Sequence, residues 1–425
     1  MEKRKVVVTG LGTINPTGNT VSDSWANIRQ GVCGIGEITA FDASEYKVKM
    51  AGEVKDFDPT TCLERKEIRH MARFTQLAMV AADEALADSG LITPTEETPR
   101  YCAPINDSNP TRCGVIISCG IGGLDVIEDN HDKGLARGFE KVSPFFIPMS
   151  ITNMAAARVA ISHGLKGMCT CPVTACAGGS NAIGDAFHRI RDGYEDVMVC
   201  GGAESAVTPL AIGGFSNMKA LSLSTDPATA SIPFDLNRGG FVLGEGAGML
   251  VLEEMEHAKA RGAKIYAEIV GYGSNCDAYH ITSPAPDGSG GAACMELAIE
   301  DASLKPQDID YINAHGTSTH MNDLCETMAI HKVFGDYAKD VAISSTKSMT
   351  GHLLGGAGGV EAVFCVKALE DGFIPATVGL TTPDPECDLD YTPNTGRDAD
   401  LTYALSNSLG FGGHNACLIF AKNKA

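Results

Sequence analysis

The sequence lacks any apolar run long enough to cross a bilayer, since no uninterrupted apolar segment reaches the roughly 20 residues that a spanning helix needs. Its first ten residues pass from charge directly into a β-branched run, without the apolar region and cleavage site of a secretory signal. Basic residues are scarce: 33 Lys and Arg stand against 53 Asp and Glu, for a formal net charge of −20. An acidic surface repels phosphate backbones and anionic lipid, so we expect neither nucleic-acid nor membrane partners.

Zinc-site spacing is also missing, although the chain has 15 cysteines. An odd number of cysteines without an export signal indicates reduced thiols in the cytoplasm, most of them small buried hydrophobes. Cys169, Cys171 and Cys176 bring three thiols together, but no Cys or His pair follows at ligand spacing. We therefore expect no metal and no cofactor. A thiol-rich metal protein stays as an alternative that elemental analysis would reveal.

What the sequence does contain is a glycine-punctuated alternation of strand and helix patterns over 425 residues, which is typical of α/β architecture. Residues 180–191 carry apolar side chains at i, i+3, i+4 and i+7, and Gly193 follows, so an amphipathic helix is predicted to end there. Residues 93–111 show no periodicity and predict a surface loop. Strands are expected at 6–9, with a tight turn at 10–12, and at 115–117 and 197–200.

Three short segments recur in the same order, which indicates an internal duplication. The matched pairs are 7–12 with 269–273, 85–91 with 298–304, and 191–193 with 370–372. We place the boundary between the halves at residue 261, so that residues 1–261 and 262–425 form two similar units. Paired halves of this kind share a face, and we expect one compact body.

Cys176 is the sharpest chemical feature, in the segment Thr-Ala-Cys-Ala-Gly-Gly-Ser that leads into the amphipathic helix. A thiol at a strand-to-helix turn lies beside unpaired N–H groups and the positive end of the helix dipole, which favours the thiolate. The glycines that follow let a substrate carbonyl approach backbone N–H groups, as an oxyanion hole requires. This pattern predicts a nucleophile, while the structural alternative is one more buried cysteine.

Two histidines also stand in glycine-flanked turns. His315 follows a predicted strand in Asn-Ala-His-Gly-Thr-Ser-Thr, and His352 follows Lys347 in Lys-Ser-Met-Thr-Gly-His. Side chains in such turns can project into a pocket. We therefore expect both imidazoles and Cys176 to converge on one cavity.

These three motifs, in this order, resemble the β-ketoacyl-acyl carrier protein synthases, and most of all their type II, elongating branch. The resemblance extends over nearly the whole chain, from Val-Thr-Gly-Leu-Gly at the start to Gly-Phe-Gly-Gly-His-Asn at residues 410–415. It implies the thiolase fold, in which two similar βαβαβ-containing halves form a layered α-β-α-β-α body. It also implies a homodimer and an acyl carrier protein as the partner.

The implied reaction is a decarboxylative Claisen condensation between malonyl-acyl carrier protein and an acyl chain held on Cys176. The resemblance assigns His315 and His352 as donors to the enolate, with Lys347 beside them, and Cys176 and Phe411 as oxyanion hole and gate. It further assigns pantetheine binding to Thr317 and Thr319, the acyl pocket to Ile121, Phe146 and Phe215, and support to Glu326. Phe146 is expected to reach the partner subunit's pocket.

A basic patch is expected to dock the acidic carrier protein. On a predicted helix, Arg65 and Arg69 form a row that Arg73 continues at i+8, with Lys66 beside it; the alternative is a solvated helix face. Two features depart from the family: residues 93–111 form a longer loop, and Cys169 and Cys171 crowd the nucleophile, which suggests oxidative sensitivity.

Other functions remain open at this stage. A type II polyketide ketosynthase subunit shares the motifs, and a non-catalytic chain-length subunit would lack the nucleophile. A thiolase would need a second catalytic cysteine near the C-terminus, where this chain instead has Gly-Gly-His-Asn.

Overall fold

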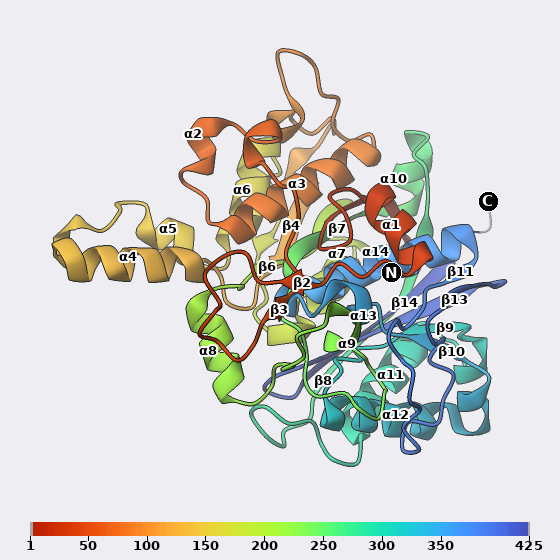
Figure 1. Ribbon diagram of the computed structural model, residues 1–425. Coiled ribbons are helices and arrows are strands. Elements are labelled where there is room, and N and C mark those ends of the chain that lie inside the picture. The colour runs from red at the N-terminus through yellow and green to blue at the C-terminus, as the bar shows by residue number, and fades with distance from the viewer. Residues whose placement is uncertain (1–2, 424–425) are drawn as a thin grey trace.

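The computed structural model describes residues 3–423, which form a mixed α/β body (Figure 1). The strands of the main sheet are β1 (Val6–Ile14), β4 (Cys113–Ser118), β5 (Cys169–Thr170), β6 (Val197–Ser205), β7 (Glu245–Glu254), β8 (Ala267–Cys276), β9 (Tyr311–Asn313), β10 (Ala342–Ser344), β13 (Tyr403–Gly410) and β14 (His414–Lys422). Two short ribbons pair β2 (Gly36–Glu37) with β3 (Met50–Ala51), and β11 (Phe373–Ile374) with β12 (Arg397–Asp398).

The strands on the two sides of the main sheet follow the same order when they are traced outward from the middle. Its order is β10-β9-β13-β14-β8-β1-β7-β6-β4-β5, so β1, β7, β6, β4 and β5 correspond to β8, β14, β13, β9 and β10. The two sets join through a short antiparallel contact in which three residues of β1 pair with three of β8. The predicted two similar halves are confirmed by this order.

Helices cover both faces of each half and also fill the space between them. They are α1 (Val21–Gln30), α2 (Arg65–Ile68), α3 (Arg73–Asp88), α4 (Leu124–Arg137), α5 (Phe146–Ser150), α6 (Met154–His163), α7 (Gly178–Arg191), α8 (Pro209–Asn217), α9 (Pro227–Ala230), α10 (Met255–Ala260), α11 (Ser289–Asp301), α12 (His320–Phe334), α13 (Lys347–Thr350) and α14 (Ala357–Asp371). α7 and α14 contact strands of both halves, whereas α3 packs on β1, β6 and β7, and α11 packs on β8 and β14. The layers are therefore α-β-α-β-α.

The central strands are apolar on both faces because both faces are covered. On β7, Leu250 and Leu252 point to the core around α7 and α14, while Met249 and Val251 point to the core under α3. β14 repeats this alternation between the middle core and the core under α11 and α12. Buried area on both faces of each sheet is the main stabilising contribution in this fold.

The tight turn predicted at residues 10–12 is wrong, because β1 continues to Ile14 with a register shift between Val8 and Gly10. These glycines serve close packing instead. A Cβ on Gly10 would lie 2.1 Å from the Ala85 carbonyl oxygen, and one on Gly12 would lie 1.9 Å from that of Ala81. The strand backbone thus rests directly on α3, where no side chain fits.

The other predicted elements are present. β4 and β6 contain the strands predicted at 115–117 and 197–200, and α7 contains the predicted amphipathic helix. Residues 93–111 form the predicted surface loop, which is mostly exposed and contains two short 3-10 turns. The loop is anchored at Ala103, which is fully buried and whose carbonyl lies 2.8 Å from Nδ1 of buried His163. Among residues 3–423, no helix is long and apolar enough to cross a membrane.

Candidate active site

Cys176 lies in a one-turn 3-10 helix directly before α7, deep between the two halves. Ala175 enters this turn in the left-handed region, with φ of 49°, and only 7% of Cys176 is exposed. A Cβ on Gly179 would lie 2.8 Å from the backbone nitrogen of Gly359, so the starts of α7 and α14 touch backbone to backbone. This contact brings the second half up to the thiol.

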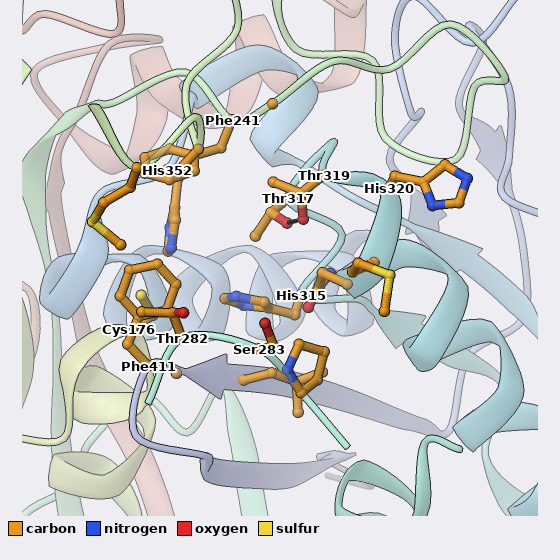
Figure 2. Close-up of a pocket in the computed structure, with 18 of the residues that line it drawn as sticks. Cys176, Phe241, Thr282, Ser283, His315, Thr317, Thr319, His320, His352 and Phe411 are labelled. Atoms are coloured by element: carbon orange, nitrogen blue, oxygen red, sulfur yellow. Dashed lines mark hydrogen bonds between the residues drawn. The ribbon is translucent and has the colours of Figure 1, made fainter. Parts of the chain in front are cut away.

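One pocket of about 540 Å³ is lined by Cys176, His315, His352 and Phe411. Figure 2 shows both imidazole rings directed at the space beside the thiol, with the Phe411 ring in front of it. The rings of the two histidines lie 5.2 Å apart, edge to face. Side chains separated by 139 and 37 residues in the sequence therefore meet at one cavity, as the convergence hypothesis requires.

His315 is held by a carboxylate from the helix that follows it. Oε1 of Glu326, on α12, accepts from the backbone N–H of His315, and Oε2 accepts from that of Gly316, each at 2.8 Å. Glu326 is 1% exposed, and burial raises its pKa to about 7. Glu326 thus fixes the turn that aims the His315 imidazole, without touching the cavity itself.

His352 leaves α13 through Gly351, whose φ of 71° requires glycine. Its backbone N–H donates to the Val242 carbonyl at 2.7 Å, and its ring packs edge-on against Phe241 at 5.3 Å. Burial lowers the pKa of both active-site histidines, and the nearby positive charge of Lys347 lowers it further. Both imidazoles are therefore neutral at pH 7 and carry one N–H donor each.

Lys347 begins α13 and is fully enclosed, with 1% exposure. Its ammonium pairs with Glu361 of α14, which is 3% exposed. Glu361 is not among the residues predicted from the sequence. The available signal was a single carboxylate within the apolar, glycine-rich start of a helix, where an unpaired charge is not tolerated.

Phe411 follows β13 in a loop whose next residues, Gly412 and Gly413, have φ of 87° and 75°. Its ring lies 6.5 Å from that of Phe215. The backbone N–H groups of Phe411 and Cys176 both lower the pKa of the thiol, so both are oriented toward its sulfur. Two backbone donors beside a buried nucleophile have the arrangement of an oxyanion hole.

Thr317 and Thr319 line the same pocket, and their hydroxyls lie 2.9 Å from each other. Ile121 and Phe215 pack against the apolar cluster that contains Cys176. Phe146 lies apart from this pocket: it is half-buried on α5, against the core under α3. Of the three predicted acyl-pocket residues, Phe215 lines the pocket, Ile121 lies at the apolar cluster beside it, and Phe146 lies apart.

Family models match both parts of the chain. Residues 3–258 match the β-ketoacyl synthase N-terminal domain, and residues 266–381 match the C-terminal domain. The chain belongs to the β-ketoacyl synthase family.

Similar β-ketoacyl synthases cover its whole length. A 3-oxoacyl-[acyl-carrier-protein] synthase 2 of Synechocystis sp. is 53% identical over 99% of each chain. One of Staphylococcus aureus is 50% identical over all of both chains. Among solved structures, a β-ketoacyl synthase from Burkholderia phymatum matches with a TM-score of 0.89 at 35% identity, over 99% of this chain and 100% of that one. A chain of the complex between a type II PKS acyl-carrier protein and its ketosynthase matches with the same TM-score, identity and coverage. The expected thiolase fold is thereby confirmed.

Burial works against the thiolate that the sequence pattern favours at Cys176. Burial raises the pKa of the Cys176 thiol to about 11, and the backbone N–H groups and Lys347 only partly offset this rise. The helix start favours the thiolate, but desolvation is the larger effect for a thiol this deeply enclosed. Cys176 rests as a thiol and must lose its proton as it reacts.

The basic row predicted for carrier docking is also wrong in part. α2 ends at Ile68, and α3 begins at Arg73, so Arg73 does not continue the row of Arg65 and Arg69. Instead, its guanidinium binds both carboxylate oxygens of Glu245, at 2.7 and 2.6 Å. Arg65, Lys66 and Arg69 remain exposed and carry what is left of the patch.

The two extra cysteines of this synthase lie at the edge of the main sheet. Cys169 is exposed on β5, Cys171 is half-buried just after it, and both have raised pKa values because of burial. No group of three His, Cys, Asp or Glu side chains within residues 3–423 is arranged to hold a metal.

Proposed function

We propose that this protein condenses malonyl-acyl carrier protein with an acyl chain bound to Cys176, releasing CO2 and giving a 3-oxoacyl chain two carbons longer. The observation that carries the proposal is the shared pocket of one thiol and two neutral imidazoles. Relatives named 3-oxoacyl-[acyl-carrier-protein] synthase 2, at 50–53% identity over the full length, support fatty acid elongation as its setting.

In the first half-reaction, the Cys176 sulfur attacks the acyl thioester of the carrier protein. A new thioester forms on Cys176, the old C–S bond breaks, and the cysteine proton ends on the departing pantetheine thiol. Because the thiol pKa is about 11, the neutral imidazoles in the pocket are the bases available to take that proton in transit. In the intermediate, the former carbonyl oxygen accepts hydrogen bonds from the backbone N–H groups of Cys176 and Phe411.

In the second half-reaction, the malonyl group loses CO2 and the C–C bond electrons form an enolate. The N–H donors of His315 and His352 stabilise the enolate oxygen, each contributing about 3–4 kcal/mol on the scale of other oxyanion donors. Lys347 keeps both rings neutral, so that each has a donor without a formal charge. The enolate carbon then attacks the acyl-Cys176 carbonyl, so that a C–C bond forms and the C–S bond to Cys176 breaks. The released sulfur takes up a proton from solvent water, which regenerates the thiol.

The remaining assignments concern the ends of the substrate. Thr317 and Thr319 bind the pantetheine arm, Phe411 gates the thiol, and Ile121 and Phe215 line the acyl chain. The exposed Arg65, Lys66 and Arg69 dock the acidic carrier protein. Reversing the charge of Arg65 and Arg69 then raises KM for the carrier protein, and an unchanged KM contradicts the docking assignment.

We also propose a homodimer that forms along β5. This strand is an edge of the sheet, and exposed apolar side chains gather on α4–α6 and beside β5. They are Leu135, Phe139, Phe145, Ile147, Ile151, Ile161, Met168 and Val173. Apolar surface on this scale marks an interface, and pairing would carry Phe146 toward the partner's acyl pocket.

The residues 1–261 and 262–425 act as the two units of one body, and reduced thiols support a cytoplasmic location.

The test uses purified protein with acyl- and malonyl-acyl carrier protein, following CO2 release and the mass of the carrier-bound product. One two-carbon extension per acyl chain is expected. Repeated extension without reduction would instead assign the protein to polyketide synthesis. No CO2 and no acyl group on Cys176 would refute the proposal.

A further inference from the structure

Glu204 lies near the end of β6 and is completely buried, yet no step of the proposed mechanism uses it. Its side chain reaches the loop that follows β4 and the turn that precedes α14. It therefore touches segments from both halves of the molecule, next to the floor of the active-site pocket.

Four donors converge on this one carboxylate. Oε1 accepts from the thiol of Cys119 at 3.1 Å and from the backbone N–H of Ile121 at 3.2 Å. Oε2 accepts from the backbone N–H of Gly120 at 2.8 Å and from that of Gly355 at 3.1 Å. Every donor around it is used, which is the condition for keeping a carboxylate in such a site.

The segments held by Glu204 each contribute a residue to the apolar surroundings of Cys176, and we take them as the two walls of the proposed acyl end. Ile121 packs against the cluster that includes Cys176, and Leu354, next to Gly355, belongs to that cluster and lines the pocket. The first wall comes from the loop after β4 and the second from the start of the α14 segment. One carboxylate thus sets the distance between walls that belong to different halves.

We propose that Glu204 is a positioning residue that fixes the width of the acyl end of the pocket and so determines which chain lengths load onto Cys176. The inference rests on the proposed function, because it assumes that acyl chains occupy this end. Longer chains reach further past Ile121 than short ones, so a displaced wall affects them most.

Glu204→Gln tests the idea with almost no change in volume. The NH2 group of the glutamine cannot accept a hydrogen bond, so at least one backbone N–H donor would lose its partner. Either the loop at Ile121 or the turn at Gly355 would then be held less tightly. Single-turnover loading of Cys176 by carrier-bound C4, C8, C12 and C16 chains is measured by mass spectrometry. We expect loading of C16 to change at least tenfold relative to C4, while condensation starting from preloaded C4 enzyme stays within about threefold of wild type.

Glu326→Gln is the matched control, because Glu326 performs the same backbone-holding role beside His315. It should slow condensation from preloaded enzyme and leave the chain-length profile of loading unchanged. A uniform loss across all chain lengths in Glu204→Gln would refute the specificity role and leave only a structural one. An unchanged profile would refute it as well.

Gly120→Ala displaces the same carboxylate from the loop after β4. This variant is the alternative test if Glu204→Gln does not fold. The added Cβ would lie 2.7 Å from Oε2 of Glu204, which has no freedom to move away. The same shift in chain-length profile is expected, and an unchanged profile counts against the inference. If wild-type protein loads no acyl chain at all, the proposed function fails rather than this inference.

Discussion

The turns before α7 and α14 occupy matching places in the two halves but carry different chemistry. Each begins with a non-glycine residue in the left-handed region, Ala175 with φ of 49° and Leu354 with φ of 46°, and each continues through one 3-10 turn into a glycine-rich helix start. The first carries Cys176, the proposed nucleophile. The second carries an apolar wall residue, and the histidine stands two residues earlier.

This difference shows what duplication supplies and what it leaves to individual residues. Two similar helix starts face one cavity. Two buried carboxylates bind backbone N–H groups near it: Glu204 binds the loop after β4 and the turn before α14, and Glu326 binds the turn at His315. The backbone geometry of the helix starts is repeated while the residue types differ, and we propose that this difference divides acylation from decarboxylation. The predictions below test whether that division is real.

The largest effect is expected for Cys176→Ala, which removes the acyl side alone. Condensation should fall by at least about a thousandfold, because no group remains to hold the acyl chain. Product formation and acyl-enzyme mass are both measured, with Cys176→Ser as the control that keeps the shape of the site. Product at a comparable rate from the Ala variant would end the nucleophile assignment.

His352→Ala removes one donor from the malonyl side. We expect condensation from preloaded enzyme to fall about 100- to 1,000-fold, while Cys176 acylation falls by less than about tenfold. Separate single-turnover measurements of the two half-reactions distinguish them. The opposite ranking would mean that the two sides are not divided as proposed.

Lys347→Met breaks the pair with Glu361 and leaves a buried carboxylate unpaired, which should cost about 3–5 kcal/mol of unfolding free energy. Because the positive charge lowers the pKa of His315 and His352, its loss raises both values. Activity should then decline at a higher pH than in wild type as the solution is acidified. Adding Glu361→Gln should restore much of the stability and leave the shifted pH profile, so the double variant separates the two effects.

The pH dependence of alkylation provides a second test of Cys176. With a pKa of about 11, alkylation of Cys176 by iodoacetamide should rise about tenfold per pH unit between pH 7 and 9, as the thiolate fraction grows. Labelling is followed at Cys176 by peptide mass spectrometry, with Cys169 as an exposed internal reference. A plateau below pH 8 would mean that the thiol is already ionised at rest.

The smallest effect is expected at Thr317, which we propose binds the pantetheine arm that both substrates share. Thr317→Val should raise KM about two- to tenfold for acyl and malonyl carrier proteins alike, since one hydrogen bond is worth about 0.5–1.5 kcal/mol. Thr319→Val is the matched variant. An effect on only one substrate would place the arm elsewhere.

The corrections share one physical origin. The turn predicted at Gly10 and Gly12 fits local glycine statistics, but the close approach of α3 explains those glycines. The row of Arg65, Arg69 and Arg73 fits helical spacing, but the helix ends and Glu245 binds Arg73. In each case a distant segment outweighs the local pattern.

By itself, the sequence determined the two halves, the strands and helices that build them, and the three motifs carrying the thiol and the imidazoles. These depend on short-range periodicity and turn residues, which act within a few positions. Only the three-dimensional fold accounts for the raised pKa of Cys176, the pairing of Lys347 with Glu361, and the binding of Glu204 to both Gly120 and Gly355. Such features depend on what covers a group and excludes water from it, and the covering segments come from the other half of the chain.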